Sequence, residues 1–143
     1  MTDIEQNWLE KLQANGYRLT GSRQRVVEIM AESKRALSPL EVFDLVRTRQ
    51  PGLGLVTVYR TLEKLEELGL IQRVHQPSGC QAFIAACNGH QHMILCSHCG
   101  MVEYFAGDDL GALFQSIGQQ TGYQIHDHWL QLFGLCAECR PNA

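Results

Sequence analysis

The stretch "CNGHQHMILCSHCG", residues 87–100, holds three of the six cysteines and three of the six histidines of the chain. Cys96 and Cys99 form a CxxC pair in it, and a second pair, Cys136 and Cys139, follows after 36 intervening residues. Two such pairs supply the four thiolates that a closed tetrahedral zinc site requires. Redox or core cysteines are the alternative, but a redox CxxC needs a helix N-terminus after a strand, which neither pair clearly has. The spacing therefore predicts a structural zinc site.

Basic side chains and potential metal ligands lie in different halves of the sequence. Residues 1–75 contain 11 of the 12 lysines and arginines against 10 acidic residues, and only Arg140 follows them. All six cysteines lie in residues 76–143, so the net charge of −3 hides a strong asymmetry. Such a split indicates two tasks on one chain, with a basic surface in the first half and metal chemistry in the second.

The composition limits the class of protein. The chain has 143 residues, of which 45% are hydrophobic, enough for a sizeable core. It contains no apolar run of the roughly 18 residues that a membrane span needs, and its start lacks the basic and apolar segments of a signal peptide. We expect a cytoplasmic protein with no membrane partner, whose cysteines stay reduced and act as ligands rather than as disulfides.

The order of the expected elements predicts an α+β fold with two domains. Ser38, Pro39 and Glu41 form the N-cap, first position and capping box of one helix. Helices are also expected over 3–15, after Thr20 and over 56–68, followed by short strands at 70–74 and 80–84. This is the order of a winged helix-turn-helix, which we place at residues 1–84. A strand at 93–96, a strand at 101–105, a helix at 109–121 and a strand at 123–133 predict a small α/β domain at residues 85–143.

Two HxH pairs, His90 with His92 and His126 with His128, suggest a second metal site. In a strand, alternate side chains point to the same face, so each pair could offer two imidazoles to one cation. Oxygen and sulfur donors stand nearby in the sequence, and the mixed set suits Zn(II), Fe(II), Mn(II) or Ni(II) without singling out one. The alternative is solvated histidines beside a zinc turn, with the remaining cysteines acting as small apolar residues. The nearby donors are Glu103, Asp108, Asp109, Cys80 and Cys87.

Over nearly its whole length the chain resembles the ferric uptake regulator superfamily of metal-sensing repressors. The resemblance implies a winged-helix DNA-binding domain, an α/β dimerisation domain, a structural zinc on Cys96, Cys99, Cys136 and Cys139, and a regulatory metal near the hinge between the domains. The matching segments are "YRLTGSRQRVVEIM", "LSPLEVFDLV", "VTVYRTLEKLEELGLI", "HQHMILCSHCG" and "FGLCAEC".

The regulatory ligands depart from the usual pattern of this family. In an ungapped alignment, His90, His92 and His128 fall on one of the family's two non-structural metal sites. Two usual histidine positions of the other, hinge sensing site are occupied by Gln91 and Met93. Peroxide-sensing members need these histidines, so the resemblance to that subtype is weaker.

The residue that completes the histidine set is open. A carboxylate that often does so in the family aligns with Gly111, so Glu103, Asp108 or Asp109 must substitute. Zinc-sensing members of the family often recruit a cysteine just upstream of these histidines, where this chain has Cys87 and Cys80. His75 is the last candidate for a ligand of the regulatory metal. Because sulfur suits zinc better than iron, we expect a second divalent metal, Zn(2+) rather than Fe(2+), and a repressor of zinc uptake genes. An iron-responsive regulator is the alternative.

The helix expected over 56–68 is the candidate recognition helix. Its N-terminal turns are the part that meets base edges in helix-turn-helix docking, and Tyr59 and Arg60 resemble the family's DNA-contacting pair. An ordinary solvated helix face is the alternative. The expected partners are a second copy of the chain and a palindromic site on double-stranded DNA, with no small-molecule substrate. The candidate DNA-binding residues are Tyr59, Arg60, Thr57 and Thr61, with Arg18, Arg23 and Arg25 for phosphates.

An enzyme or an adaptor is the rival class. A zinc hydrolase needs an open coordination position and a general base, whereas both CxxC pairs appear committed to one closed site. The deaminase signature HxE…PCxxC is absent from the sequence. We therefore expect no enzyme activity, and DNA binding that weakens steeply with salt would distinguish a regulator from a zinc-ribbon adaptor.

Overall fold

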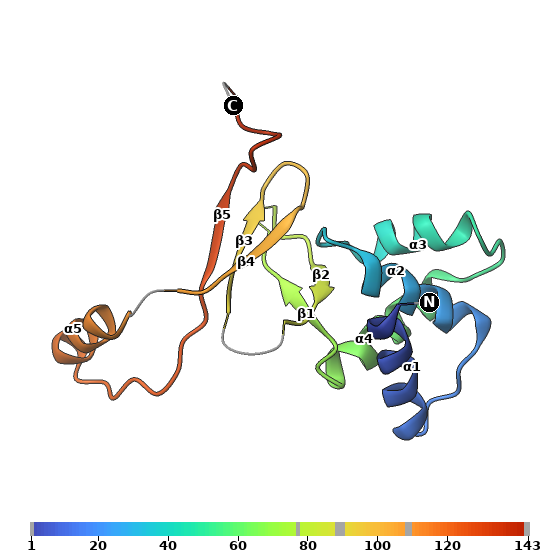
Figure 1. The fold of residues 1–143 in the computed structure, drawn as a ribbon, viewed down its shortest axis with the longest axis horizontal. Helices are drawn as coiled ribbons and strands as arrows, with labels where there is room; N and C mark the ends of the chain where they lie inside the picture. Colours follow the sequence, from blue (N-terminus) through green and yellow to red (C-terminus); the bar gives the residue numbers. More distant parts are fainter. Residues whose placement is uncertain (1, 77, 88–90, 108–109, 142–143) are drawn as a thin grey trace.

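The computed structural model describes residues 2–76, 78–87, 91–107 and 110–141. A helical N-terminal half is followed by a two-stranded and then a three-stranded sheet (Figure 1). The elements are α1 (Asp3–Ala14), α2 (Gly21–Glu32), α3 (Pro39–Arg47), α4 (Leu55–Glu67), β1 (Ile71–Val74), β2 (Ala82–Ala85), β3 (His92–Cys96), β4 (Val102–Phe105), α5 (Gly111–Thr121) and β5 (Gln131–Gly134).

Side-chain caps fix where the first helices begin, as the sequence predicts. Thr20 accepts the N–H of Arg23 at 3.2 Å and caps α2. Ser38 accepts the N–H of Glu41 at 3.2 Å, and the Glu41 carboxylate accepts the Ser38 N–H at 2.7 Å, which completes the predicted capping box of α3. Caps of this kind satisfy N–H groups that have no partner within the helix.

The first half is a winged helix with one apolar core. Its helices contribute residues at helical spacing, and α4 turns Val58, Leu62 and Leu65 inward with at most 1% exposure. Strands β1 and β2 pair antiparallel and form the wing. Leu37, between α2 and α3, exchanges two main-chain hydrogen bonds with Phe83 of β2, at 2.9 and 2.8 Å, which ties the wing to the helices.

Helix α3 buries only some of its large apolar side chains. Leu40 and Leu45 are 58% and 47% exposed, whereas Val42 and Val46 are fully buried. Val42 and Val46 are four residues apart and share one face of the helix, and the two leucines lie to either side of it. Counting the apolar residues of α3 does not by itself distinguish the buried side of the helix from the flanks of that side.

The second half is a small sheet of strand order β4-β3-β5. Strands β3 and β4 form an antiparallel hairpin, and β5 runs parallel to β3, with Met93 beside Gln131 and Cys96 beside Gly134. The strand expected over 123–133 is much shorter and covers only β5 (Gln131–Gly134). Within the described residues no strand lies beside 123–130, so this segment has no ladder to join.

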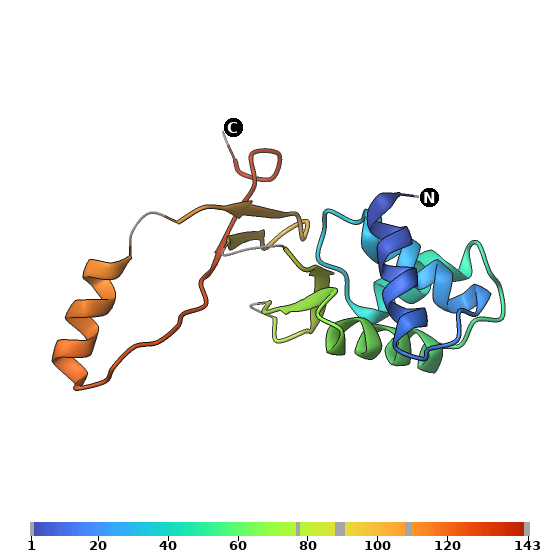
Figure 2. The same cartoon turned by 60° about the horizontal axis from the view of Figure 1, so that its bottom comes forward.

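Helix α5 projects away from the sheet in both views (Figures 1 and 2), and none of its described residues is buried. The second half consequently exposes many large apolar side chains. Large exposed apolar patches on a protein surface mark interaction sites. The exposed residues are Ile94, Leu113, Ile117, Tyr123, Ile125, Trp129, Leu132, Phe133 and Leu135.

A second apolar cluster joins the two halves. Ala36, Val74, Ala82 and Ile84 from the winged helix pack with residues of the three-stranded sheet. The sheet contributes Met93, Leu95 and Val102. The halves therefore share a core at this seam. Among the described residues, no helix is both long and apolar enough to cross a bilayer.

The core of the winged helix provides a stability test. We expect Leu65→Ala to lower the free energy of unfolding by about 2–5 kcal/mol, because Leu65 is fully buried and its removal leaves a cavity. Leu40→Ala is the matched control on an exposed leucine and should cost under about 0.5 kcal/mol. Urea unfolding followed by circular dichroism measures both, and equal losses would contradict this placement of the core.

Candidate metal centre and nucleic-acid interface

The structure brings the four cysteines of the two CxxC pairs together. The Sγ atoms of Cys96, Cys99, Cys136 and Cys139 all lie within 4.8 Å of one another. A tetrahedral zinc with Zn–S bonds of about 2.3 Å requires sulfurs about 3.8 Å apart, and Cys99 Sγ lies 3.8 Å from Cys136 Sγ. Cys96 is buried and the other three are half-buried. The donor set and its spacing therefore fit a single zinc ion.

Two tight turns and one strand pairing position these sulfurs. Cys96 ends β3, and the Gly100 N–H donates to its carbonyl at 3.0 Å to close the first turn. The Cys139 N–H donates in the same way to the Cys136 carbonyl at 3.0 Å. The Ser97 N–H donates to the carbonyl of Gly134, the last residue of β5, at 2.8 Å, and so joins the two segments.

Gly100 meets two constraints at the first turn. Its φ is +78°, a conformation that residues with a side chain rarely adopt. A Cβ at this position would also lie 3.3 Å from the carbonyl oxygen of Ala36. The turn therefore requires glycine for its own shape and for its close approach to the winged helix.

Hydrogen bonding shifts the pKa values of two of the four thiols in opposite directions. Main-chain N–H groups, that of Cys99 first and that of Cys136 next, lower the pKa of Cys96 to about 6. The Cys136 N–H lies 3.4 Å from Cys96 Sγ. Hydrogen bonding to Cys136 and burial raise the pKa of Cys139 to about 12. The site thus favours the thiolate of Cys96 and the neutral thiol of Cys139, and a bound cation would favour the thiolate at both.

A histidine pair forms a separate cluster. His92 is 5% exposed, and its ring centroid lies 5.2 Å from that of His128 and 5.6 Å from that of Phe105. The His128 ring lies 4.6 Å from the ring of Phe114 in α5. A side chain at Gly107 would collide with the His92 ring. The structure therefore brings together two of the three histidines that the resemblance implies.

The other predicted regulatory ligands do not converge on this pair. His90, Asp108 and Asp109 lie outside the described residues. Among the residues that the structure describes, only the four cysteines form a group of three or more donors within metal-binding distance. The remaining candidates, Glu103, Cys87, Cys80 and His75, lie outside that group.

Each remaining candidate has its own surroundings. The Cys87 thiol donates to Gln91 Oε1 at 2.8 Å. Cys80 is exposed in the wing turn. The His75 ring packs against the Trp129 ring edge to face, with centroids 5.2 Å apart. Glu103 of β4 is exposed and lines, together with Cys96 and Cys136, a hollow of about 220 Å³.

The exposed face of α4 presents the predicted DNA-contacting pair. Tyr59 is 45% exposed, and Arg60 is exposed beside it. Thr57 is half-buried. Thr61 is fully buried, and its hydroxyl donates to the Thr57 carbonyl at 2.8 Å, because the helix turns it toward the core. Thr61 is therefore removed from the set of proposed DNA contacts.

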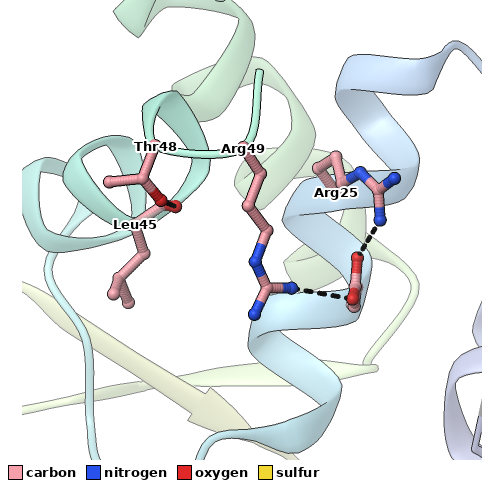
Figure 3. Close-up of polar contacts among 5 residues, drawn as sticks. Arg25, Leu45, Thr48 and Arg49 are labelled. Carbon is pink, nitrogen blue, oxygen red and sulfur yellow. Dashed lines mark hydrogen bonds and ion pairs between the residues drawn. The ribbon is translucent and has the colours of Figure 1, made fainter. Parts of the chain in front are cut away.

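Arginines around α2 are the remaining predicted DNA contacts, and Figure 3 shows one of them, Arg25, converging with Arg49 on one carboxylate. Arg25 and Arg49 lie 2.6 and 2.8 Å from the oxygens of Glu28, and the hydrogen bond from Arg25 is the main cause of the lowered pKa of that carboxyl. Arg23 donates to the carbonyl of Arg18. Exposed ion pairs of this kind contribute little to stability, so Arg25 can exchange Glu28 for a phosphate at low cost.

Arg49 is a residue that the sequence analysis missed. It lies 21 positions after Glu28, and its guanidinium reaches α2 only because α3 packs against that helix. No short-range pattern in the sequence signals such a pair. The Glu28 carboxylate therefore holds two arginines on this surface, one predicted and one not.

A winged helix joined to a sheet with a four-cysteine centre is the architecture of a metal-dependent transcription regulator. The chain belongs to the ferric uptake regulator family, whose model matches residues 14–133. Members of this family are regulators that bind DNA as dimers, and they are not enzymes. The family match and the solved structures confirm the predicted fold class.

Individual relatives cover most of the chain. The ferric uptake regulation protein of Bacillus subtilis is 32% identical over 135 residues, 91% of this chain and 90% of that protein. That of Neisseria meningitidis is 29% identical over 137 residues, 95% of each chain. The solved structure of the ferric uptake regulator from Francisella tularensis with iron matches with a TM-score of 0.70 at 27% identity, covering 88% of this chain and 96% of that one.

Loss of one sulfur should release the zinc. We expect Cys96→Ser to lower the zinc content of the purified protein from about one ion per chain to near zero, since a closed site needs all four ligands. Elemental analysis by mass spectrometry measures this content. Cys80→Ser is the matched control at an exposed cysteine and should retain the metal. Full zinc content in Cys96→Ser would show that the four sulfurs do not share one ion.

Proposed function

We propose that this chain is a zinc-responsive repressor that controls genes for zinc uptake in the cytoplasm. The observation that carries the proposal is the contact between His92 and His128, a pair of histidines separate from the four cysteines. Residues 1–84 serve as the DNA-binding domain and residues 85–143 as the dimerisation domain. Cys96, Cys99, Cys136 and Cys139 hold the structural zinc.

The sensing site uses His92 and His128, with His90 as the third imidazole of the set. A bound divalent cation would supply bonds that hold these imidazoles in one arrangement. Phe105 and Phe114 flank the pair and limit the entry of water. Since β3 begins at His92, the position of its ring is fixed with the strand.

A cysteine close to the histidines in the sequence supports zinc as the sensed metal. Cys87 lies five residues before His92, and its thiol is half-buried and hydrogen-bonded to Gln91. Thiolate donors favour zinc over Fe(II), which prefers oxygen and nitrogen ligands in sensing sites. Iron is the second candidate, because relatives that cover most of this chain are named for ferric uptake.

The exposed apolar surface of the second half supports a homodimer. Helix α5 has no buried residue among those described, and Leu113 and Ile117 on it are 55% and 38% exposed. A symmetric partner would cover such a surface, since homodimer interfaces are more apolar than ordinary surfaces. Two-fold symmetry places two α4 helices about one DNA turn apart, which matches a palindromic operator.

DNA contacts are assigned to the exposed start of α4. Tyr59 and Arg60 read base edges, and Arg18, Arg23 and Arg25 neutralise phosphates. The acidic residues of α4 lie toward its C-terminal end, and Glu66 there is already paired with Arg73 at 2.6 Å. The N-terminal turns are thus the part of the helix that suits the DNA.

Removal of metal, followed by addition of one ion at a time, identifies the metal that the protein senses. We expect mild chelation to leave the structural zinc in place and abolish the gel shift of operator DNA, and added Zn(II) to restore it. A typical coupling free energy of about 1–3 kcal/mol corresponds to about 5- to 150-fold tighter DNA binding. Restoration by Fe(II) under anaerobic conditions, but not by Zn(II), would assign the sensing role to iron. Binding that ignores the chelator would contradict metal sensing altogether.

The role of Arg60 is tested by substitution. Arg60→Ala should weaken operator binding by about 1–3 kcal/mol and leave the fold intact, because the side chain is exposed and contacts a base. Arg140→Ala removes the same charge from the other half and should change binding little. Fluorescence anisotropy with labelled duplex measures both affinities, and equal effects of the two substitutions would show that Arg60 contributes only general charge.

A further inference from the structure

Gln131 makes two hydrogen bonds across the seam between the halves. The His75 N–H donates to Gln131 Oε1 at 3.3 Å, and Gln131 Nε2 donates to the His75 carbonyl at 2.8 Å. The two residues are 56 positions apart in the sequence. The side-chain amide thus satisfies both main-chain groups of His75, as a neighbouring strand would.

His75 is the residue at which the turn of the wing begins, directly after β1. Strand β1 ends at Val74, and the turn before β2 follows directly, closed by a hydrogen bond from the Gly79 N–H to the Gln76 carbonyl at 2.9 Å. The His75 ring also packs against Trp129, two residues before Gln131. Trp129 and Gln131 together hold the base of the wing from the side of the three-stranded sheet.

The same short segment carries His128. Its ring contacts those of His92 and Phe114, and only two residues separate it from Gln131. Gln131 lies beside Met93 in the parallel pairing of β3 and β5, and Met93 directly follows His92. Any change in how His92 and His128 are held relative to each other is therefore applied to the backbone that carries Gln131.

We propose that Gln131 is a positioning residue that transmits the state of the His92–His128 pair to the wing through the main chain of His75. This inference rests on the proposed metal-sensing function. The side chain of Gln131 then connects the sensing histidines to the DNA-binding domain. The amide suits this role because it fixes both the N–H and the carbonyl of His75. It thereby fixes the direction in which the turn of the wing leaves β1.

A second polar contact across the seam provides a contrast. Tyr104 of β4 donates its hydroxyl to the Ala85 carbonyl at 2.8 Å and accepts from Gln72 Nε2 at 3.4 Å. Burial raises the pKa of this hydroxyl, so it remains a donor. Tyr104 holds β2 and does not belong to the segment of His128. Its loss should weaken docking of the halves whether or not metal is bound.

The test measures the coupling between zinc binding and DNA binding in the chain of 143 residues. The probe is a palindromic duplex that the wild-type chain selects from a random pool, and the readout is the ratio of its dissociation constants without and with Zn(II). Gln131→Met keeps the length of the side chain and loses both hydrogen bonds, and should lower this ratio about fivefold or more. Gln131→Glu, which cannot donate to the His75 carbonyl, should lower it too. Gln124→Met, at an exposed glutamine before the segment, should leave it unchanged.

Reciprocity provides a second measurement of the same coupling, made from the side of zinc binding. DNA must raise zinc affinity by the same factor by which zinc raises DNA affinity. Competition with a chromophoric chelator, with and without duplex, should therefore show the same fold-loss in Gln131→Met. Tyr104→Phe should weaken DNA binding equally in both zinc states and preserve the ratio.

The outcomes separate this inference from the proposed function. A Gln131→Met ratio that stays within about twofold of wild type, or a loss of DNA affinity that is equal with and without zinc, overturns the role of Gln131 alone. A wild-type ratio of one overturns the proposed function, and this inference with it. A reduced ratio in both Gln131 variants with a normal Gln124→Met establishes the coupling.

Discussion

The structure of the second half depends on the convergence of four sulfurs at one point. Its sheet has short strands, β5 pairs with β3 over only four residues, and α5 buries none of its described residues. Apolar packing within one copy is therefore modest, and a ligand cross-link has to hold the distant segments together. Structural zinc sites contribute on the order of 10 kcal/mol of folding free energy.

The same turn that holds two of the sulfurs also reaches the winged helix. The Ala36 N–H donates to the Gly100 carbonyl at 2.8 Å, and Arg35 pairs with Met101 in an antiparallel bridge. Leu37, next along the chain, pairs with the wing strand β2. One linker segment thus contacts the cysteine turn and the wing, so ordering of the metal centre and placement of the DNA-binding domain are physically connected.

Local chemistry explains which features could be predicted from the sequence. The Ser38–Glu41 capping box and the two CxxC pairs depend on short spacings, and the structure shows both. The contacts of Thr61, Arg49 and Gln131 depend on which residues of distant segments lie beside them. Thr61 is polar yet faces the core, Arg49 reaches a carboxylate on another helix, and Gln131 meets a main chain 56 positions away. The predicted length of the strand after residue 122 was wrong for the same reason, because a strand needs a neighbouring strand with which to pair.

The most direct measurement is X-ray absorption at the zinc edge on the purified protein, before any regulatory metal is added. We expect a first shell of four sulfurs at about 2.3 Å, with zinc at about one ion per chain. A shell dominated by nitrogen or oxygen, or a folded protein that contains no zinc, would contradict a centre formed by Cys96, Cys99, Cys136 and Cys139.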